Sequence, residues 1–147
     1  MGGAGHRCLL QQSEGNSEAL RPASGPPRCR AWPVDDLARF VDPETVVLCA
    51  GSDPSDAATL RSAGLKVVKL PMPRLLWFDG RQLPASYANF YIANGLVLVP
   101  TFNDPNDRAA LTTLAEQFPG REVVGINCTE LIWGLGALHC MTQQQPA

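Results

Sequence analysis

The stretch that decides the fold is SYANFYIANGLVLVPTFNDPNDRAALTTLAEQFPGREVVGIN, residues 86–127. Residues 86–94 alternate bulky side chains with small or polar ones, and that period of two predicts a strand. Asn94 and Gly95 follow as a strong hairpin signal. The apolar run over 96–100 predicts the strand that returns from this turn.

The second part of the stretch predicts a helix and one more strand. Asp104 and Pro105 are typical of a helix start, so a helix is expected over 105–118. Residues 122–127 then read as a strand. The order is strand, turn, strand, helix, strand, which places a helix on one side of a small mixed sheet.

The preceding residues repeat part of this order. The β-branched run 45–50 predicts a buried strand, residues 54–63 a helix capped by Ser52 or Asp53, and 65–72 another strand. Residues 35–41 fit either a helical turn or a short strand. The chain is therefore expected to be an α/β protein with two such units, one of them partial, each needing neighbours to bury its apolar face.

The ends of the chain are less regular. Residues 1–30 contain five glycines and three prolines and show no sustained period, so a tail outside the fold is expected. After Thr129 we expect a single helical turn, and residues 138–142 are interpreted as a last strand.

Composition limits the classes of function. The chain has 147 residues and a net charge of -2, which suits one domain and indicates no nucleic-acid partner. No apolar run approaches the roughly 18 residues of a membrane span, and no signal peptide is evident. The five cysteines are odd in number and lack CxxC spacing, which argues against a disulfide framework or a zinc site and favours reduced thiols in the cytoplasm.

Cys140 is the first candidate for chemistry. It ends the segment Gly134-Leu135-Gly136-Ala137-Leu138-His139-Cys140, whose glycines would let backbone approach a ligand closely. A thiolate is a nucleophile, but a lone cysteine is more often an inert buried residue. Because neighbouring residues of a strand point to opposite faces, His139 is not expected to meet Cys140. The other histidine, His6, lies in the expected tail.

Several acidic and aromatic residues remain open to two interpretations. Asp35 and Asp36 could bind a guanidinium through paired hydrogen bonds, or could be a solvated helix cap. Helix capping explains the acidic residues of the two DPxD segments, which are Asp53, Asp56, Asp104 and Asp107. The three tryptophans could line a pocket or pack on the protein; they are Trp32, Trp77 and Trp133. Spacing does not assign a role to Gln143, Gln144 and Gln145.

The strings SYANFYIANG and HCMTQQQP are specific, and with VDDLARFVDPETVVL they make residues 34–147 resemble the C-terminal part of the agmatine deiminases. These enzymes belong with the bacterial-type peptidylarginine deiminases. The resemblance implies a five-bladed α/β propeller, or pentein, of which this chain would supply about two ββαβ blades. Residues 1–33 do not share it.

The resemblance also implies a reaction. A cysteine thiolate attacks the guanidinium carbon of agmatine, ammonia leaves, and water releases N-carbamoylputrescine from an amidino-cysteine, a step toward putrescine. Carried over by position, Cys140 is the nucleophile, Asp35 binds the guanidinium, and Gly134 and Gly136 are the glycines ahead of the cysteine. No metal or organic cofactor is implied, and the expected partner is a small guanidine substrate.

Three departures from the family pattern matter. The DGH tripeptide of the family is Ala31-Trp32-Pro33 here, so Pro33 stands where a histidine would act as acid and base. Leu135 replaces a glycine and Ala137 an asparagine. We therefore expect little turnover from this chain alone. The alternatives are completion by missing blades or self-association, an inactive binding protein, and deimination of peptidyl-arginine.

Overall fold

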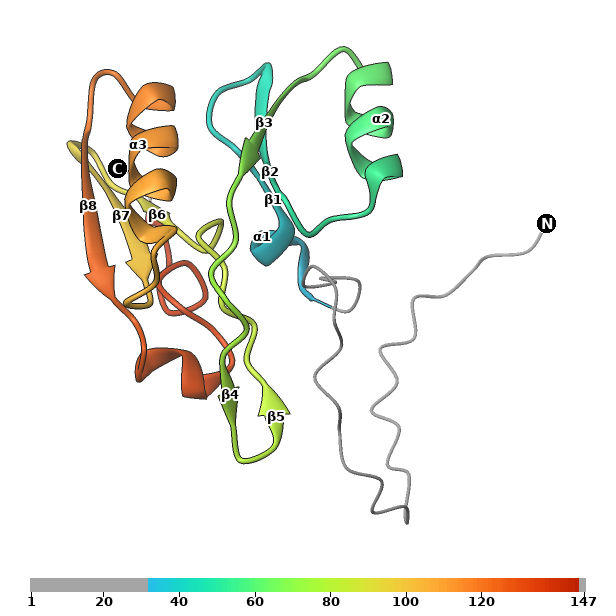
Figure 1. Ribbon diagram of the computed structural model, residues 1–147. Helices are drawn as coiled ribbons and strands as arrows, with labels where there is room; N and C mark the ends of the chain where they lie inside the picture. Colours follow the sequence, from blue (N-terminus) through green and yellow to red (C-terminus); the bar gives the residue numbers. More distant parts are fainter. Residues whose placement is uncertain (1–31, 146–147) are drawn as a thin grey trace.

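The computed structural model describes residues 32–145 and contains two small mixed sheets of the same topology, β1-β2-β3 and β6-β7-β8 (Figure 1). In each sheet the middle strand pairs antiparallel with the strand before it and parallel with the strand after it. Each parallel pair is joined by a helix, as parallel neighbours require. The α/β class and the repeated strand–strand–helix–strand order are therefore confirmed.

The first unit contains α1 (Val34–Leu37), β1 (Ala38–Phe40), β2 (Thr45–Cys49), α2 (Pro54–Ser62) and β3 (Lys66–Leu70). Both alternatives for residues 35–41 occur, because a helical turn leads directly into a short strand. All five residues of β2 are buried, as its β-branched sequence predicts. The α2 helix begins with a capping box between Asp53 and Asp56, followed by proline at its first position.

The second unit contains β6 (Tyr91–Ile92), β7 (Leu96–Thr101), α3 (Asp107–Gln117) and β8 (Glu122–Asn127). The hairpin at Asn94 and Gly95 joins β6 to β7, and the backbone N–H of Ala93 donates to the carbonyl of Leu96 at 2.9 Å. β7 and β8 then pair in parallel over six residues. The helix begins two residues later than expected, because Asp104 and Pro105 form the turn before it.

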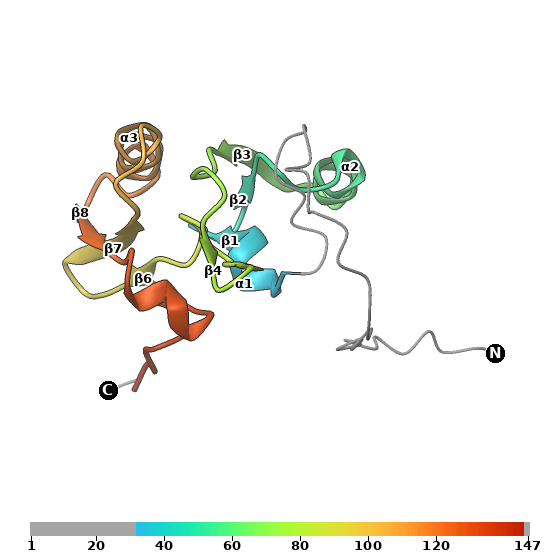
Figure 2. The same ribbon diagram turned by 60° about the horizontal axis from the view of Figure 1, so that its bottom comes forward.

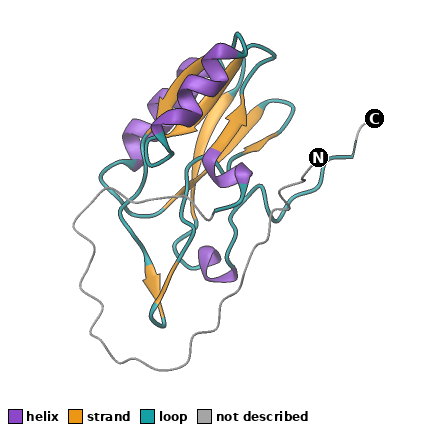
Figure 3. Ribbon diagram, turned by 90° about the vertical axis from the view of Figure 1, so that its right-hand side faces the viewer, coloured by secondary structure: helices purple, strands orange, loops and turns teal. Residues whose placement is uncertain are grey.

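The two long helices lie on one side of the strands, and the 3-10 turn η1 (Leu131–Gly134) lies on the other (Figure 2). Figure 3 shows the long helices packed along the strands. Between the two units, β4 (Trp77–Phe78) and β5 (Arg81–Gln82) form a short hairpin that the sequence did not predict. No helix of residues 32–145 is long and apolar enough to cross a membrane.

One predicted strand is much shorter than expected, and another is wrong. Over residues 86–94 only Tyr91 and Ile92 are in a strand, and residues 86–90 form a buried, irregular crossing between the two sheets. Their side chains do not alternate between core and solvent, because the crossing has protein on all sides. Residues 138–142 form a turn, closed by a hydrogen bond from the Thr142 N–H to the His139 carbonyl at 3.1 Å.

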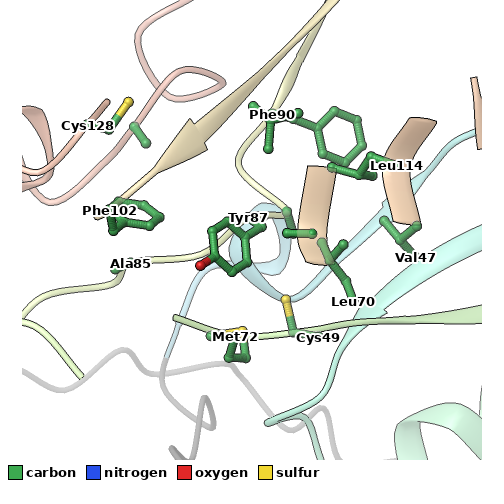
Figure 4. Close-up of a cluster of buried hydrophobic side chains, with 14 of the residues drawn as sticks. Val47, Cys49, Leu70, Met72, Ala85, Tyr87, Phe90, Phe102, Leu114 and Cys128 are labelled. Atoms are coloured by element: carbon green, nitrogen blue, oxygen red, sulfur yellow. The ribbon is translucent and has the colours of Figure 1, made fainter. Parts of the chain in front are cut away.

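The core runs continuously through both units, with Tyr87 in its middle (Figure 4). The Tyr87 ring packs against Phe102 at 5.8 Å between centroids, and its hydroxyl donates to Asp107 Oδ1 at 2.8 Å. The fully buried side chains of the core include Val47, Leu70, Phe90, Val97, Val99, Leu114 and Ile132. The irregular crossing is therefore part of the core, and it brings Asn89 to the place where the two units meet. The expected tail, residues 1–30, lies outside the described residues.

Candidate active site

The first wall of the site is the short helix α1. Pro33 precedes it, and Asp35 and Asp36 occupy its first turn. Neither carboxylate caps the helix, and the Asp36 side chain is buried, with 1% of the residue exposed. The interpretation of these two acids as a solvated cap is therefore wrong. The Asp35 carboxylate is partly exposed and faces the C-terminal turn of the chain.

The second wall is the turn that carries Cys140. The Cys140 Sγ lies 3.4 Å from Asp35 Oδ2, and His139 Nδ1 lies 2.9 Å from the same oxygen. The expectation that His139 points away from Cys140 assumed a strand at this position. In the turn, both side chains reach one carboxylate, although 105 residues separate Asp35 from Cys140 in the chain.

The two glycines ahead of the cysteine have different surroundings. A Cβ atom added at Gly136 would lie 2.6 Å from the Cys140 Cβ and 3.1 Å from its Sγ. A Cβ atom at Gly134 would meet nothing within 4 Å. Between them, Leu135 takes a φ of 65°, the left-handed region that favours glycine. Gly136 is thus required for the close approach of the chain to Cys140, and Gly134 makes no such contact.

Asn89 contacts both α1 and the turn that carries Cys140, and the sequence did not predict its role. Its Nδ2 lies 2.8 Å from Asp36 Oδ1, 3.1 Å from Cys140 Sγ and 3.3 Å from Asp35 Oδ2. Its Oδ1 accepts hydrogen bonds from the backbone N–H groups of His139 at 3.0 Å and Cys140 at 3.3 Å. The asparagine was hidden in a segment read as an alternating strand. A polar amide within an otherwise apolar run was the signal that could have found it.

The two carboxyl groups have opposite electrostatic environments. Burial acts to raise the pKa of Asp35, but hydrogen bonds from His139 and Cys140 outweigh it and hold that pKa below its ordinary value. Burial, with the neighbouring charge of Asp35, raises the pKa of Asp36 to about 6. One oxygen of Asp36, Oδ2, is buried without a hydrogen-bond partner. Asp35 therefore carries the negative charge that faces the sulfur.

The environment of the sulfur disfavours its ionised form. Partial burial raises the pKa of the Cys140 thiol above its ordinary value, and the charge of Asp35 adds to that effect, while the hydrogen bond from Asn89 opposes it. Cys49 and Cys128 are buried, so Cys140 is the one exposed cysteine among residues 32–145. A cation bound to the Asp35 carboxylate beside the sulfur would favour the thiolate, which is the nucleophilic form.

The remaining candidates lie elsewhere. Asp53 and Asp56 form the capping box of α2, which confirms capping there. Asp104 and Asp107 accept hydrogen bonds from backbone N–H groups in the turn before α3, but the N-cap residue of α3, Asn106, makes no side-chain cap hydrogen bond, so the expected cap is confirmed for α2 alone. Trp32 packs on the core, Trp77 is exposed, and Trp133 stacks on Phe78 at 4.5 Å between ring centroids. The glutamines 143–145 are exposed. His6, Cys8 and Cys29 lie outside the described residues.

A hollow of about 360 Å³ lies apart from Cys140, lined by Ala50, Gly51, Pro71, Met72, Pro73, Arg74 and Asn106. It contains neither a thiol nor a carboxylate, so the reactive groups are not gathered there. Within residues 32–145, no group of three His, Cys, Asp or Glu side chains could hold a metal ion. What the cluster at Cys140 offers is a thiol beside a carboxylate, which is suited to attack on a planar cation.

Comparisons with known proteins show the family of the chain. The model of the Porphyromonas-type peptidyl-arginine deiminase family matches residues 31–146. A relative in Latilactobacillus sakei, provisionally assigned as an agmatine deiminase, is 33% identical over 78% of this chain and 40% of its own length. The agmatine deiminase of Enterococcus faecalis, solved as it catalyses its reaction, has a TM-score of 0.69 and 32% identity over 77% of this chain and 40% of that one.

A C. jejuni agmatine deiminase solved with substrate bound is 30% identical, with a TM-score of 0.67 over 72% of this chain and 34% of that one. The chain spans 22 to 40% of the length of the curated relatives it matches. The family model, by contrast, covers all of the described residues. The chain therefore belongs to the Porphyromonas-type peptidyl-arginine deiminase family.

Proposed function

We propose that this chain carries the nucleophile and one cation-binding carboxylate of an agmatine deiminase, a hydrolase that converts agmatine and water to N-carbamoylputrescine and ammonia. Cys140 is the nucleophile and Asp35 binds the guanidinium. The observation that carries the proposal is the 3.4 Å distance between Cys140 Sγ and Asp35 Oδ2. A guanidinium held by that carboxylate would place its carbon near the sulfur.

In the proposed reaction the Cys140 thiolate adds to the guanidinium carbon and forms a C–S bond. A proton is delivered to one amino group, which leaves as ammonia, and the C–N bond breaks. Water then adds to the amidino-cysteine carbon, and the C–S bond breaks to release the ureido product and the thiol. Gly136 supports the first step because it leaves room for Cys140, while Gly134 is assigned to the site by the family resemblance alone.

The charge arrangement supports substrate capture before thiolate formation. Without a cation, burial and the negative charge of Asp35 hold the thiol in its neutral form. A bound guanidinium would neutralise that charge and lower the pKa of the sulfur. The thiol would then become reactive chiefly when a substrate is present, which also limits its oxidation in the cytoplasm, where we place the reaction.

The two repeated units are proposed as about two blades of a five-bladed propeller. Their shared strand order supports this assignment, as does the 40% of the E. faecalis chain that they match. Each three-stranded sheet has outer strands with unpaired backbone groups, and further blades or a second copy of the chain would cover them. With Pro33 in place of the family histidine, we expect little ammonia release from this chain alone.

Two other functions remain candidates, each on one observation. Pro33 cannot transfer a proton, which favours a protein that binds guanidines without turning them over. The name of the matching family favours arginine within a peptide as the substrate. Competition by agmatine or by an arginine-containing peptide against labelling of Cys140 would separate these substrates.

The test uses a matched pair of small alkylating reagents, cationic 2-chloroacetamidine and neutral 2-chloroacetamide. Peptide mass spectrometry of the full chain gives the labelling rate of each cysteine. Cys49 and Cys128 are buried, so slow labelling of these two shows that the chain stays folded. After correction for the reactivity of each reagent with a free thiol, we expect the cation to be preferred by about tenfold or more at Cys140. The same ratio at every labelled cysteine would overturn the proposal.

A further inference from the structure

The side chain of Asn89 is fully buried and holds Cys140 from two directions. Its Nδ2 contacts the sulfur at 3.1 Å, and its Oδ1 accepts from the Cys140 backbone N–H at 3.3 Å. One amide group therefore fixes both the side chain and the main chain of the same residue. The Oδ1 atom also accepts from the His139 N–H at 3.0 Å, which extends this hold along the turn.

The orientation of the Asn89 amide is determined by its neighbours. Acceptors surround Nδ2: the carboxylate oxygens of Asp36 and Asp35 at 2.8 and 3.3 Å, and the sulfur. Donors surround Oδ1, because both contacts there are backbone N–H groups. A flipped amide would place its oxygen against two carboxylates and its NH₂ against two N–H groups, which is strongly unfavourable.

Asp36 is the anchor of this orientation. Its Oδ1 makes the shortest of the Asn89 contacts, and its Oδ2 is buried without a partner. A buried carboxyl group with one unsatisfied oxygen is costly to keep. Packing alone does not explain a carboxyl group at this position, since an apolar side chain would fill the same space. The contact of Asp36 with Asn89, however, keeps Asn89 Nδ2 turned toward the sulfur.

The backbone around Asn89 is also fixed. The Arg39 guanidinium donates to the carbonyls of Ala88 at 3.4 Å and Phe90 at 3.0 Å, one on each side of Asn89, and stacks over the Phe90 ring at 4.8 Å. The Ser86 hydroxyl donates to the Asp36 carbonyl at 2.6 Å. The crossing segment is thereby tied to α1 and β1, so the amide is preorganised before any ligand arrives.

We propose that Asn89 is a positioning residue for the nucleophile, that its Nδ2 hydrogen bond stabilises Cys140 as the thiolate, and that Asp36 holds the amide in the orientation this requires. The role in deimination rests on the function proposed above. The hydrogen bond itself does not, because it acts on the sulfur whether or not a guanidine binds. The thiol form donates to Asp35 and the thiolate form accepts from Asn89, so the two contacts favour opposite protonation states.

The test measures the pH at which Cys140 is half-ionised, from its alkylation rate with neutral iodoacetamide, using the full chain. In Asn89→Ala this midpoint should rise by about one pH unit, because a hydrogen bond to an ionised acceptor is lost. Asn106→Ala is the matched control: Asn106 also donates a side-chain hydrogen bond, to the Met72 carbonyl at 2.8 Å, away from Cys140. That control should leave the midpoint unchanged. An unchanged midpoint in folded Asn89→Ala would overturn the proposal.

A second measurement uses the wild-type chain, in case Asn89→Ala does not fold. The charged or titratable groups around the sulfur are Asp35, Asp36, Arg39 and His139. We expect the side-chain NH₂ resonances of Asn89 to shift with the same midpoint as Cys140 alkylation, and this shift to vanish in Cys140→Ser, which keeps the other four groups. Asn89 resonances that do not shift when Cys140 ionises would refute the proposed hydrogen bond to the thiolate. Neither readout uses a guanidine, so failure here is distinct from failure of the proposed function.

Discussion

Replacing Gly136 by alanine should displace the proposed nucleophile. The new Cβ atom would lie 2.6 Å from the Cys140 Cβ, against an ordinary contact distance of at least 3.4 Å, so one of the two must move by about 0.8 Å. The neighbour is the fixed Cβ of the cysteine and not the end of a flexible chain. A shift of that size would weaken the contacts of the sulfur with Asn89 and Asp35, and a misplacement of about 1 Å can reduce a reaction rate by about 10²-fold.

The assay is the labelling rate of Cys140 by 2-chloroacetamidine, with unfolding by urea as the measure of stability. We expect Gly136→Ala to label about 10- to 100-fold more slowly and to lose about 1–3 kcal/mol of unfolding free energy through overpacking. Gly134→Ala is the matched control, because its Cβ meets nothing within 4 Å, and its rate should stay within about twofold. Equal effects of the two substitutions would refute the close-approach argument.

Two further predictions concern stability. Leu135→Gly should raise the melting temperature by a few degrees, because it removes a left-handed strain of about 1 kcal/mol at an exposed residue; a lower melting temperature would contradict this. The pKa of Asp36 is raised to about 6 in the folded chain. The stabilisation that its protonated form contributes is therefore complete below about pH 4, and up to about 3 kcal/mol of unfolding free energy is lost as the pH rises past 6. Asp36→Asn should therefore gain stability relative to wild type over that range in urea unfolding, and a pH-independent difference would argue against a buried, raised carboxyl.

Local sequence signals predicted the regular elements well. The β-branched run of β2, the capping box of α2 and the Asn94-Gly95 hairpin each depend on residues close together in the chain. The crossing over residues 86–90 could not be predicted in this way. Its alternation imitates a strand, but its conformation is imposed by Arg39 and by the core on both sides, which are contacts of long sequence separation.

The candidate site likewise contains residues that the sequence predicted and residues that it did not. Asp35 and Cys140 were chosen through a family resemblance, and the structure brings them within 3.4 Å. His139 was misplaced because a strand was assumed where the chain turns. Asn89 was missed because its importance comes from four partners that are distant in sequence. No local pattern reports such a convergence, whereas a buried amide can be recognised at once from coordinates.

The central claim is that Asp35 makes the Cys140 sulfur selective for a planar cation. The most direct test is the ratio of the Cys140 labelling rates with 2-chloroacetamidine and 2-chloroacetamide, compared between wild type and Asp35→Asn. We predict that this ratio falls by about tenfold or more in the variant, while the rate with the neutral reagent rises, because loss of the carboxylate lowers the pKa of the thiol. An unchanged ratio, with the fold intact, would contradict the account.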